Sequence, residues 1–139
     1  MMKIILIVFI MVLGIIPAVC LAGDVVVIAN PSVYETTLSK KDICNIYLGE
    51  KTTWNDSSKI TFVVLTGDTH DTFLKSFVNK TEAQFNTFWK KQVFTGKGSP
   101  PKELNSDQAM VEFVAQTRGA IGYVSADADV SKVKPITIK

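Results

Sequence analysis

A chain of 139 residues has room for one domain, because a domain usually takes roughly 100–200 residues. The chain is 47% apolar and 20% charged, with a formal net charge of +2. These proportions exclude a multidomain chain, a polytopic membrane protein and a disordered or collagen-like polymer.

The apolar residues are concentrated at the N-terminus, where residues 1–22 carry a single charge, Lys3. A continuous apolar run follows Lys3, and Cys20 and Ala22 place small side chains at positions −3 and −1 of a signal peptidase site. We predict a signal peptide over residues 1–22 and a domain over residues 23–139. The alternative is a retained anchor, since about 18 apolar residues can just span a bilayer. We expect export of the domain.

Export also decides how the cysteines are interpreted. Cys20 leaves with the signal peptide, so the domain keeps one thiol, Cys44, and no internal disulfide is expected. The remaining basic and acidic residues nearly balance and are scattered along the sequence. Neither nucleic-acid binding nor attraction to a membrane surface is therefore predicted.

The first expected elements are two buried strands with a helix between them. Residues 24–29 and 60–65 are apolar runs rich in β-branched side chains, which is typical of strands covered on both faces. Ser39 is a predicted N-cap, and Gly49 is predicted to end the helix. Cys44 lies on this helix beside isoleucines, so we interpret it as a half-buried structural thiol.

Three more helices are predicted after the second strand. Asp68 or Thr69 is expected to cap the first, Thr81 the second through a capping box, and Ser106 the third. Trp54 is expected to be a core anchor, as is Trp89. The apolar positions expected to face inward on the three helices are Phe73, Leu74, Phe77, Val78, Phe85, Phe88, Trp89, Val93, Met110, Phe113 and Val114.

The rest of the chain completes an alternating pattern. Residues 95–104 are predicted as a loop rich in Gly and Pro, residues 120–124 as a strand and residues 134–138 as a last strand. Gly122 is expected to permit close packing, and Tyr123 is either a core residue or a ligand contact. Strands that alternate with helices favour an α/β layered domain.

Catalytic and metal chemistry receive little support from the sequence. The one histidine, His70, could pair with Cys44 as a nucleophile, but the helical position of Cys44 favours a structural role. His70 together with Asp68 and Asp71 lacks the ligand spacing of a metal site. We therefore predict a protein that is not an enzyme and that uses no metal or other cofactor.

The turn after the second strand is the better candidate for a ligand site. There a strand passes into a helix, whose free N–H groups and positive dipole end favour an oxyanion. Gly67 allows close backbone approach, Thr69 adds a hydroxyl, and Asp68 can accept a hydrogen bond from a protonated oxyanion. The alternative is that Asp68 only caps the helix. The candidate ligand-binding residues are Thr66, Gly67, Asp68, Thr69 and His70.

A second glycine-containing segment looks superficially like a phosphate loop. Residues 95–99 read Thr-Gly-Lys-Gly-Ser, but the earlier glycine of a P-loop is missing and the segment follows a helix instead of a strand. We interpret it as a connector.

Several short motifs occur in a fixed order along the domain. They are Leu38-Ser39, Ile46-Tyr47-Leu48-Gly49, Trp54-Asn55, Phe88-Trp89, Phe94-Thr95-Gly96-Lys97-Gly98 and Gly119-Ala120-Ile121-Gly122-Tyr123-Val124. In this order they resemble the phosphate-binding-protein-like family, the periplasmic substrate-binding components of phosphate ABC transporters and their short relatives. The resemblance implies an α/β fold, a single class II periplasmic-binding-protein lobe with a central, mostly parallel sheet flanked by helices. It also implies export across the inner membrane to the periplasm, an oxyanion such as phosphate as ligand, and an ABC permease or another envelope protein as partner.

The resemblance includes two departures from the family. Full-length members hold the ligand between two lobes, and this domain corresponds mainly to one. The family's phosphate loop has an arginine before serine-glycine-threonine, and these positions fall on Val63, Gly67, Asp68 and Thr69, so the guanidinium is missing. Three hypotheses follow: an exported oxyanion-binding lobe, an envelope interaction module that has lost its ligand, and a homodimer that rebuilds a cleft.

Overall fold

Two strongly apolar segments of the chain form central strands of the main sheet. The computed structural model describes residues 24–139, so the predicted signal segment lies outside the described residues. The strands of the main sheet are β1 (Val25–Ala29), β3 (Thr61–Leu65), β4 (Lys102–Leu104), β5 (Ala120–Ser125) and β6 (Lys134–Pro135). Their order across the sheet is β4-β3-β5-β1-β6.

Strand directions follow from the pairings within this sheet. β3 is parallel to β4 and to β5, whereas β1 is antiparallel to β5 and to β6. β1 is therefore the strand that runs against the others. The predicted α/β fold with a mostly parallel sheet is confirmed.

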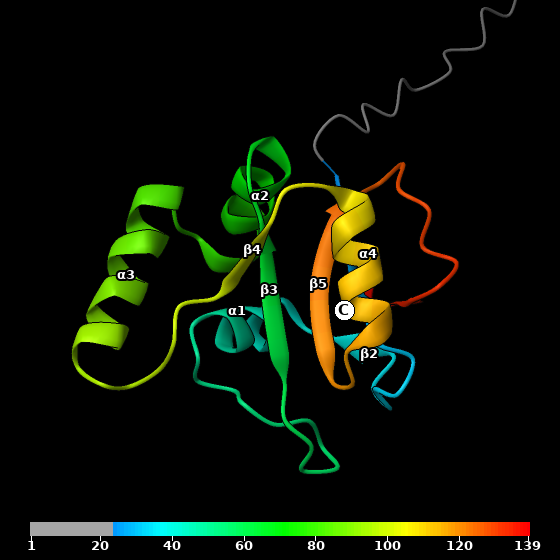
Figure 1. Ribbon diagram of the computed structural model, residues 1–139, viewed down its shortest axis with the longest axis horizontal. Helices are drawn as coiled ribbons and strands as arrows, with labels where there is room; N and C mark the ends of the chain where they lie inside the picture. Colours follow the sequence, from blue (N-terminus) through cyan, green and yellow to red (C-terminus); the bar gives the residue numbers. More distant parts are fainter. Residues whose placement is uncertain (1–23) are drawn as a thin grey trace, which may run out of the picture.

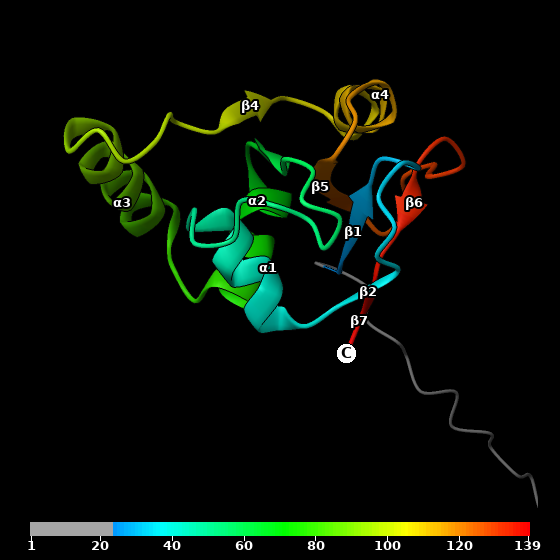
Figure 2. The ribbon, with the colours of Figure 1, turned by 90° about the horizontal axis from the view of Figure 1, so that it is seen from below.

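Helices cover both faces of the sheet. The helical elements are α1 (Lys40–Tyr47), α2 (Asp68–Phe73), the π-helix η1 (Leu74–Val78), α3 (Glu82–Phe94) and α4 (Asp107–Gln116). α4 lies on one face, over β5, and α1 and α2 lie on the opposite face (Figures 1 and 2). α3 stands beyond the β4 edge of the sheet (Figure 1).

The predicted helix starts are confirmed at three of the helices. Ser39 and Thr81 each form a capping box, and the Ser106 hydroxyl accepts a hydrogen bond from the N–H of Ala109. On α3, however, the inward prediction is wrong for Val93, which is 43% exposed. Because α3 lies beyond the sheet edge, its buried stripe is narrow and consists of Phe85 and Trp89.

Both tryptophans are core anchors, as predicted. Trp54 and Trp89 are 3% and 7% exposed. The indole N–H of Trp54 donates to the carbonyl of Gly119 at 3.0 Å, and that of Trp89 donates to the carbonyl of Tyr47 at 3.1 Å. Each indole therefore joins segments that are distant in sequence.

Two predictions about irregular segments are corrected. The predicted loop 95–104 ends in β4, whose short, polar sequence gives no hydrophobic pattern but pairs with Val63–Leu65. The predicted last strand, 134–138, is divided between β6 and β7 (Thr137–Ile138), and β7 pairs with β2 (Thr37–Leu38) in a second sheet. The two strands are separated at Ile136, whose N–H donates a hydrogen bond to the carbonyl of Val27.

β5 is packed closely against α4, as the glycine in it predicts. A Cβ atom at Gly122 would overlap the sulfur of Met110 and lie 3.2 Å from Val114 Cγ2. Tyr123 points to the opposite face, where its ring stacks on Phe73 with centroids 3.8 Å apart. Tyr123 is thus a buried core residue.

Candidate ligand-binding site

The turn that joins β3 to α2 lies at the carboxyl end of the parallel strands. Thr66, Gly67 and Asp68 are exposed, and Thr69 is partly exposed. The Thr66 N–H donates to the carbonyl of Leu104, which ties the turn to β4. Gly67 has φ of 86° and ψ of −156°, a backbone region that glycine alone enters without strain. The backbone of the turn is therefore both fixed and open to solvent.

The N-terminus of α2 differs from the sequence-based expectation. Neither Asp68 nor Thr69 caps the helix; the N-cap is Gly67, and no side chain hydrogen-bonds to the first turn. The reason is that α2 begins at Asp68, so Asp68 and Thr69 already lie inside the helix and the residue before it, Gly67, has no side chain to act as a cap. The first N–H groups of α2 therefore receive no side-chain acceptor from the described part of the chain, and they remain open to an anion.

His70 lies on the buried side of α2, away from the exposed turn. It is 3% exposed, and its Nδ1 lies 2.5 Å from the Tyr123 hydroxyl. That hydroxyl also accepts the N–H of Leu65 at 3.0 Å, so its own proton is left to donate to Nδ1. Burial lowers the pKa of His70, and the weaker opposing fields of Glu82, Asp71 and Glu103 do not reverse the shift.

The buried pair therefore consists of a neutral histidine and a neutral tyrosine. Burial raises the pKa of Tyr123 well above its ordinary value, so its hydroxyl keeps the proton that it donates to His70. The structure thus brings His70 to the core beneath the turn, where it fixes α2 to β5. This support was not evident from the sequence, in which His70 and Tyr123 are 53 positions apart.

A Cys–His nucleophilic pair finds no support in this geometry. His70 is bonded to Tyr123, while Cys44 is a free, partly buried thiol on α1. Burial, with a smaller contribution from Glu50, raises the pKa of Cys44, which disfavours the reactive thiolate. Cys44 fits the structural role predicted for it.

The edge of the sheet around the turn is acidic. Asp68 and Asp71 lie in the first turn of α2, and Asp107 begins α4 at the same edge. The Ser125 hydroxyl, at the end of β5, hydrogen-bonds to Asp107 and Asp127. An anion held here must therefore rely on uncharged donors, namely backbone N–H groups and hydroxyls, because the charged side chains around the turn are negative like the ligand.

The position of the family's arginine is occupied by Val63, as the sequence indicates. Val63 is fully buried inside β3, and its carbonyl accepts the hydroxyl of Tyr47 at 3.1 Å. The Val63 side chain is apolar and buried, so it offers no hydrogen bond to a ligand at the exposed turn. Within residues 24–139, no group of three or more His, Cys, Asp or Glu side chains is arranged to hold a metal ion. No helix in the same range has the length and apolar character needed to cross a bilayer.

Comparison with protein-family models gives a match over nearly the whole chain. The matching model is described as a PBP superfamily domain, and it covers residues 13–137. No curated protein sequence matches the chain.

Solved structures with the same fold include phosphate-binding proteins. A putative phosphate ABC transporter substrate-binding protein with bound phosphate from Clostridium perfringens has a TM-score of 0.64 at 17% identity, over 82% of this chain and 44% of its own. A possible phosphate binding protein from Planctomyces limnophilus has a TM-score of 0.60 at 18% identity, over 83% and 41%. An ABC-type phosphate transport receptor from Vibrio cholerae has a TM-score of 0.57 at 19% identity, over 82% and 45%. The chain therefore spans less than half the length of these proteins.

Proposed function

We propose that the chain, which belongs to the family described as the PBP superfamily domain, is an exported, periplasmic solute-binding protein. It would hold phosphate or a similar oxyanion at the first turn of α2, without catalysis. The observation that carries the proposal is the N-terminus of α2, where Gly67 replaces a side-chain cap. At the other helices, the hydroxyls of Ser39, Thr81 and Ser106 accept hydrogen bonds from first-turn N–H groups. An anion at the start of α2 would take the same role for the first-turn N–H groups of α2. This arrangement fits a ligand that supplies its own oxygen atoms.

Three side chains of the turn would define the ligand. The Thr66 and Thr69 hydroxyls can donate hydrogen bonds to an oxyanion, and Asp68 can accept a hydrogen bond from an oxyanion that carries a proton. Phosphate keeps a proton near neutral pH and sulfate does not, so Asp68 favours phosphate over sulfate. His70 would support the turn from below through its bond to Tyr123.

The turn between β3 and α2 is exposed, so it encloses a bound ligand on one side only. We propose that a second copy of the chain or an envelope partner such as an ABC permease covers the other side.

Calorimetric titration of the purified protein with phosphate and with sulfate tests this function. Phosphate should release or absorb measurable heat at millimolar concentration and raise the melting temperature, and sulfate should bind more weakly. Thr69→Val keeps the side-chain shape but removes the hydroxyl, and the loss of a hydrogen bond to a charged group, about 1.5–3 kcal/mol, weakens phosphate binding roughly 10- to 100-fold. Asp68→Asn should abolish the preference for phosphate.

Thr87→Val is the matched control, because Thr87 is an exposed threonine on α3. It should leave phosphate binding unchanged. Absence of heat and of any rise in melting temperature at millimolar phosphate in the unmodified protein would refute the proposal.

A second candidate function is protein interaction in the cell envelope. Phe94, at the end of α3, is 93% exposed, and its neighbour Val93 is 43% exposed, so two adjacent apolar side chains face solvent there. If the chain acts through this residue, Phe94→Ser should abolish co-purification of an envelope partner. Tyr34→Ser, at another highly exposed aromatic, is the control. Unchanged co-purification with Phe94→Ser would reject this candidate.

A further inference from the structure

A groove of about 640 Å3 crosses the edge of β3 at the end opposite to α2. It is bounded by the start of β3, by the loop 97–102 that follows α3, and by side chains of α3 and α4. In Figure 1 this loop is at the lower left, and α2 is at the upper end of β3. The volume is within the range of roughly 300–1,000 Å3 that is usual for small-molecule sites.

The groove exists because β4 pairs with only part of β3. The first paired residue of β4 is Lys102, which lies opposite Val63, so the beginning of β3 has no strand partner on this side. Pro100 and Pro101 have no backbone N–H and cannot extend the pairing. The loop therefore stands away from the β3 edge and leaves it open.

Aromatic side chains form the apolar part of the groove. Trp89 is held in place by the hydrogen bond from its indole to Tyr47, and its ring centroid lies 5.5 Å from that of Phe62. A Cβ atom at Gly98 would lie 3.3 Å from the Trp89 ring, so the loop packs closely on the indole. Phe113 of α4 contributes a second flat surface. The hydrogen bond and the packing hold the Trp89 wall in place.

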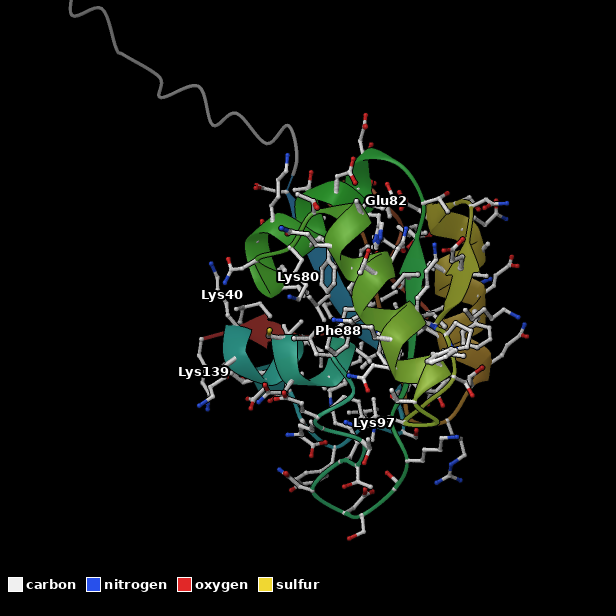
Figure 3. The ribbon with its side chains drawn as sticks, turned by 90° about the vertical axis from the view of Figure 1, so that its left-hand side faces the viewer. Lys40, Lys80, Glu82, Phe88, Lys97 and Lys139 are labelled. Atoms are coloured by element: carbon white, nitrogen blue, oxygen red, sulfur yellow. The ribbon has the colours of Figure 1, made fainter. Side chains whose placement is uncertain are left out.

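The charged side chains of the groove are all lysines. They are Lys59, Lys97 and Lys102, and none of the described residues lining the groove carries a carboxylate. Lys102 Nζ lies 5.2 Å from the Phe113 ring centroid. Figure 3 shows Lys97 beyond the end of α3, far from Glu82 at the other end of the same helix. By contrast, the cavity beside α4 is lined by three acids and one lysine.

We propose that this groove binds a small organic anion with a flat apolar body. The body would pack against Phe113 and the small exposed part of Trp89, and a carboxylate or sulfonate would lie between Lys59 and Lys97. The site is separate from the α2 turn, where the surrounding charges are acidic. It therefore extends the proposed oxyanion binding with a second ligand class at the opposite end of β3.

Titration of the 15N-labelled protein with naphthalene-2-sulfonate, followed by NMR, tests the proposal. The probe should shift the indole N–H signal of Trp89 and the amide signal of Gly98. The amide signal of Gly67, at the opposite end of β3, is an internal control and should not move. The neutral analogue 2-naphthol should bind more weakly, because it offers no full charge to the lysines.

The lysines are tested with a double variant, Lys59→Gln with Lys97→Gln. Its affinity for naphthalene-2-sulfonate should fall, by up to about fivefold for each exposed lysine. Lys75→Gln, at an exposed lysine of η1, should leave the affinity unchanged. Equal binding of 2-naphthol, an unchanged affinity of the double variant, or shifts that omit Trp89 and Gly98 would each overturn the proposal. The probe and the signals differ from those of the phosphate titration, so the two proposals fail independently.

Discussion

Replacement of Tyr123 by phenylalanine removes one oxygen atom from the core and tests the support beneath the candidate site. The hydroxyl of Tyr123 makes two hydrogen bonds there, one from the Leu65 N–H and one to His70 Nδ1. Tyr123→Phe keeps the ring stacked on Phe73 but leaves both partners unsatisfied. His70 and Leu65 are both buried, so water does not replace the lost partner in the native packing.

The size of the effect follows from the two unsatisfied groups. Each buried polar group left without a partner costs about 1–3 kcal/mol, so the free energy of unfolding should fall by about 2–6 kcal/mol. Tyr47→Phe is a matched comparison, because the buried Tyr47 hydroxyl makes one hydrogen bond, to the carbonyl of Val63. It should cost about half as much. Tyr34→Phe, at an exposed tyrosine, should be neutral.

Urea unfolding followed by circular dichroism measures all three variants. A loss for Tyr123→Phe that exceeds the loss for Tyr47→Phe, at unchanged urea dependence, is the expected result. If Tyr123→Phe costs no more than Tyr34→Phe, the hydroxyl does not hold His70 and Leu65, and the account of the site's support is wrong.

Three further predictions concern the same region. Because burial lowers the pKa of His70, the unfolded chain binds a proton below its ordinary pKa of about 6.5 while the folded chain does not. Stability should therefore fall between pH 7.5 and 5.5, by at most about 1.4 kcal/mol per pH unit, and His70→Asn should flatten this slope in urea unfolding. In Gly67→Ala the added methyl group meets no atom within 4 Å, but the backbone angles of residue 67 should lower the free energy of unfolding by about 1–3 kcal/mol. A decrease below about 0.5 kcal/mol, the size of a neutral surface change, would contradict this. Gly122→Val should lower the free energy of unfolding by about 1–3 kcal/mol or more, because the larger side chain overpacks against Met110. Adding Met110→Ala should restore part of that stability. Thermal unfolding that shows no restoration would refute the packing argument.

Much of the fold follows from local patterns in the sequence. The runs at 24–29 and 60–65 form β1 and β3, because their side chains are apolar on both faces and the sheet is covered on both sides. The hydroxyl residues Ser39, Thr81 and Ser106 begin helices as their capping chemistry indicates. These features depend on interactions within a few residues, which the sequence displays directly.

Features that depend on distant partners were missed or mistaken. β4 is a strand only because its backbone pairs with β3, since its own residues have no strand pattern. The bond between His70 and Tyr123 arises from the packing of α2 on β5, and nothing in the local sequence specifies it. The cap of α2 was misplaced because a glycine with positive φ can start a helix without a side-chain acceptor.

The position of a bound oxyanion is the central question, and an NMR titration with inorganic phosphate answers it most directly. If the turn between β3 and α2 binds phosphate, the amide signals of Gly67, Asp68 and Thr69 should move together and saturate at millimolar phosphate. Signals of the capped helix starts at Ser39 and Thr81 should remain in place. Unmoved signals at residues 67–69, or shifts confined to the lysine-lined groove around Lys97, would contradict the proposed site.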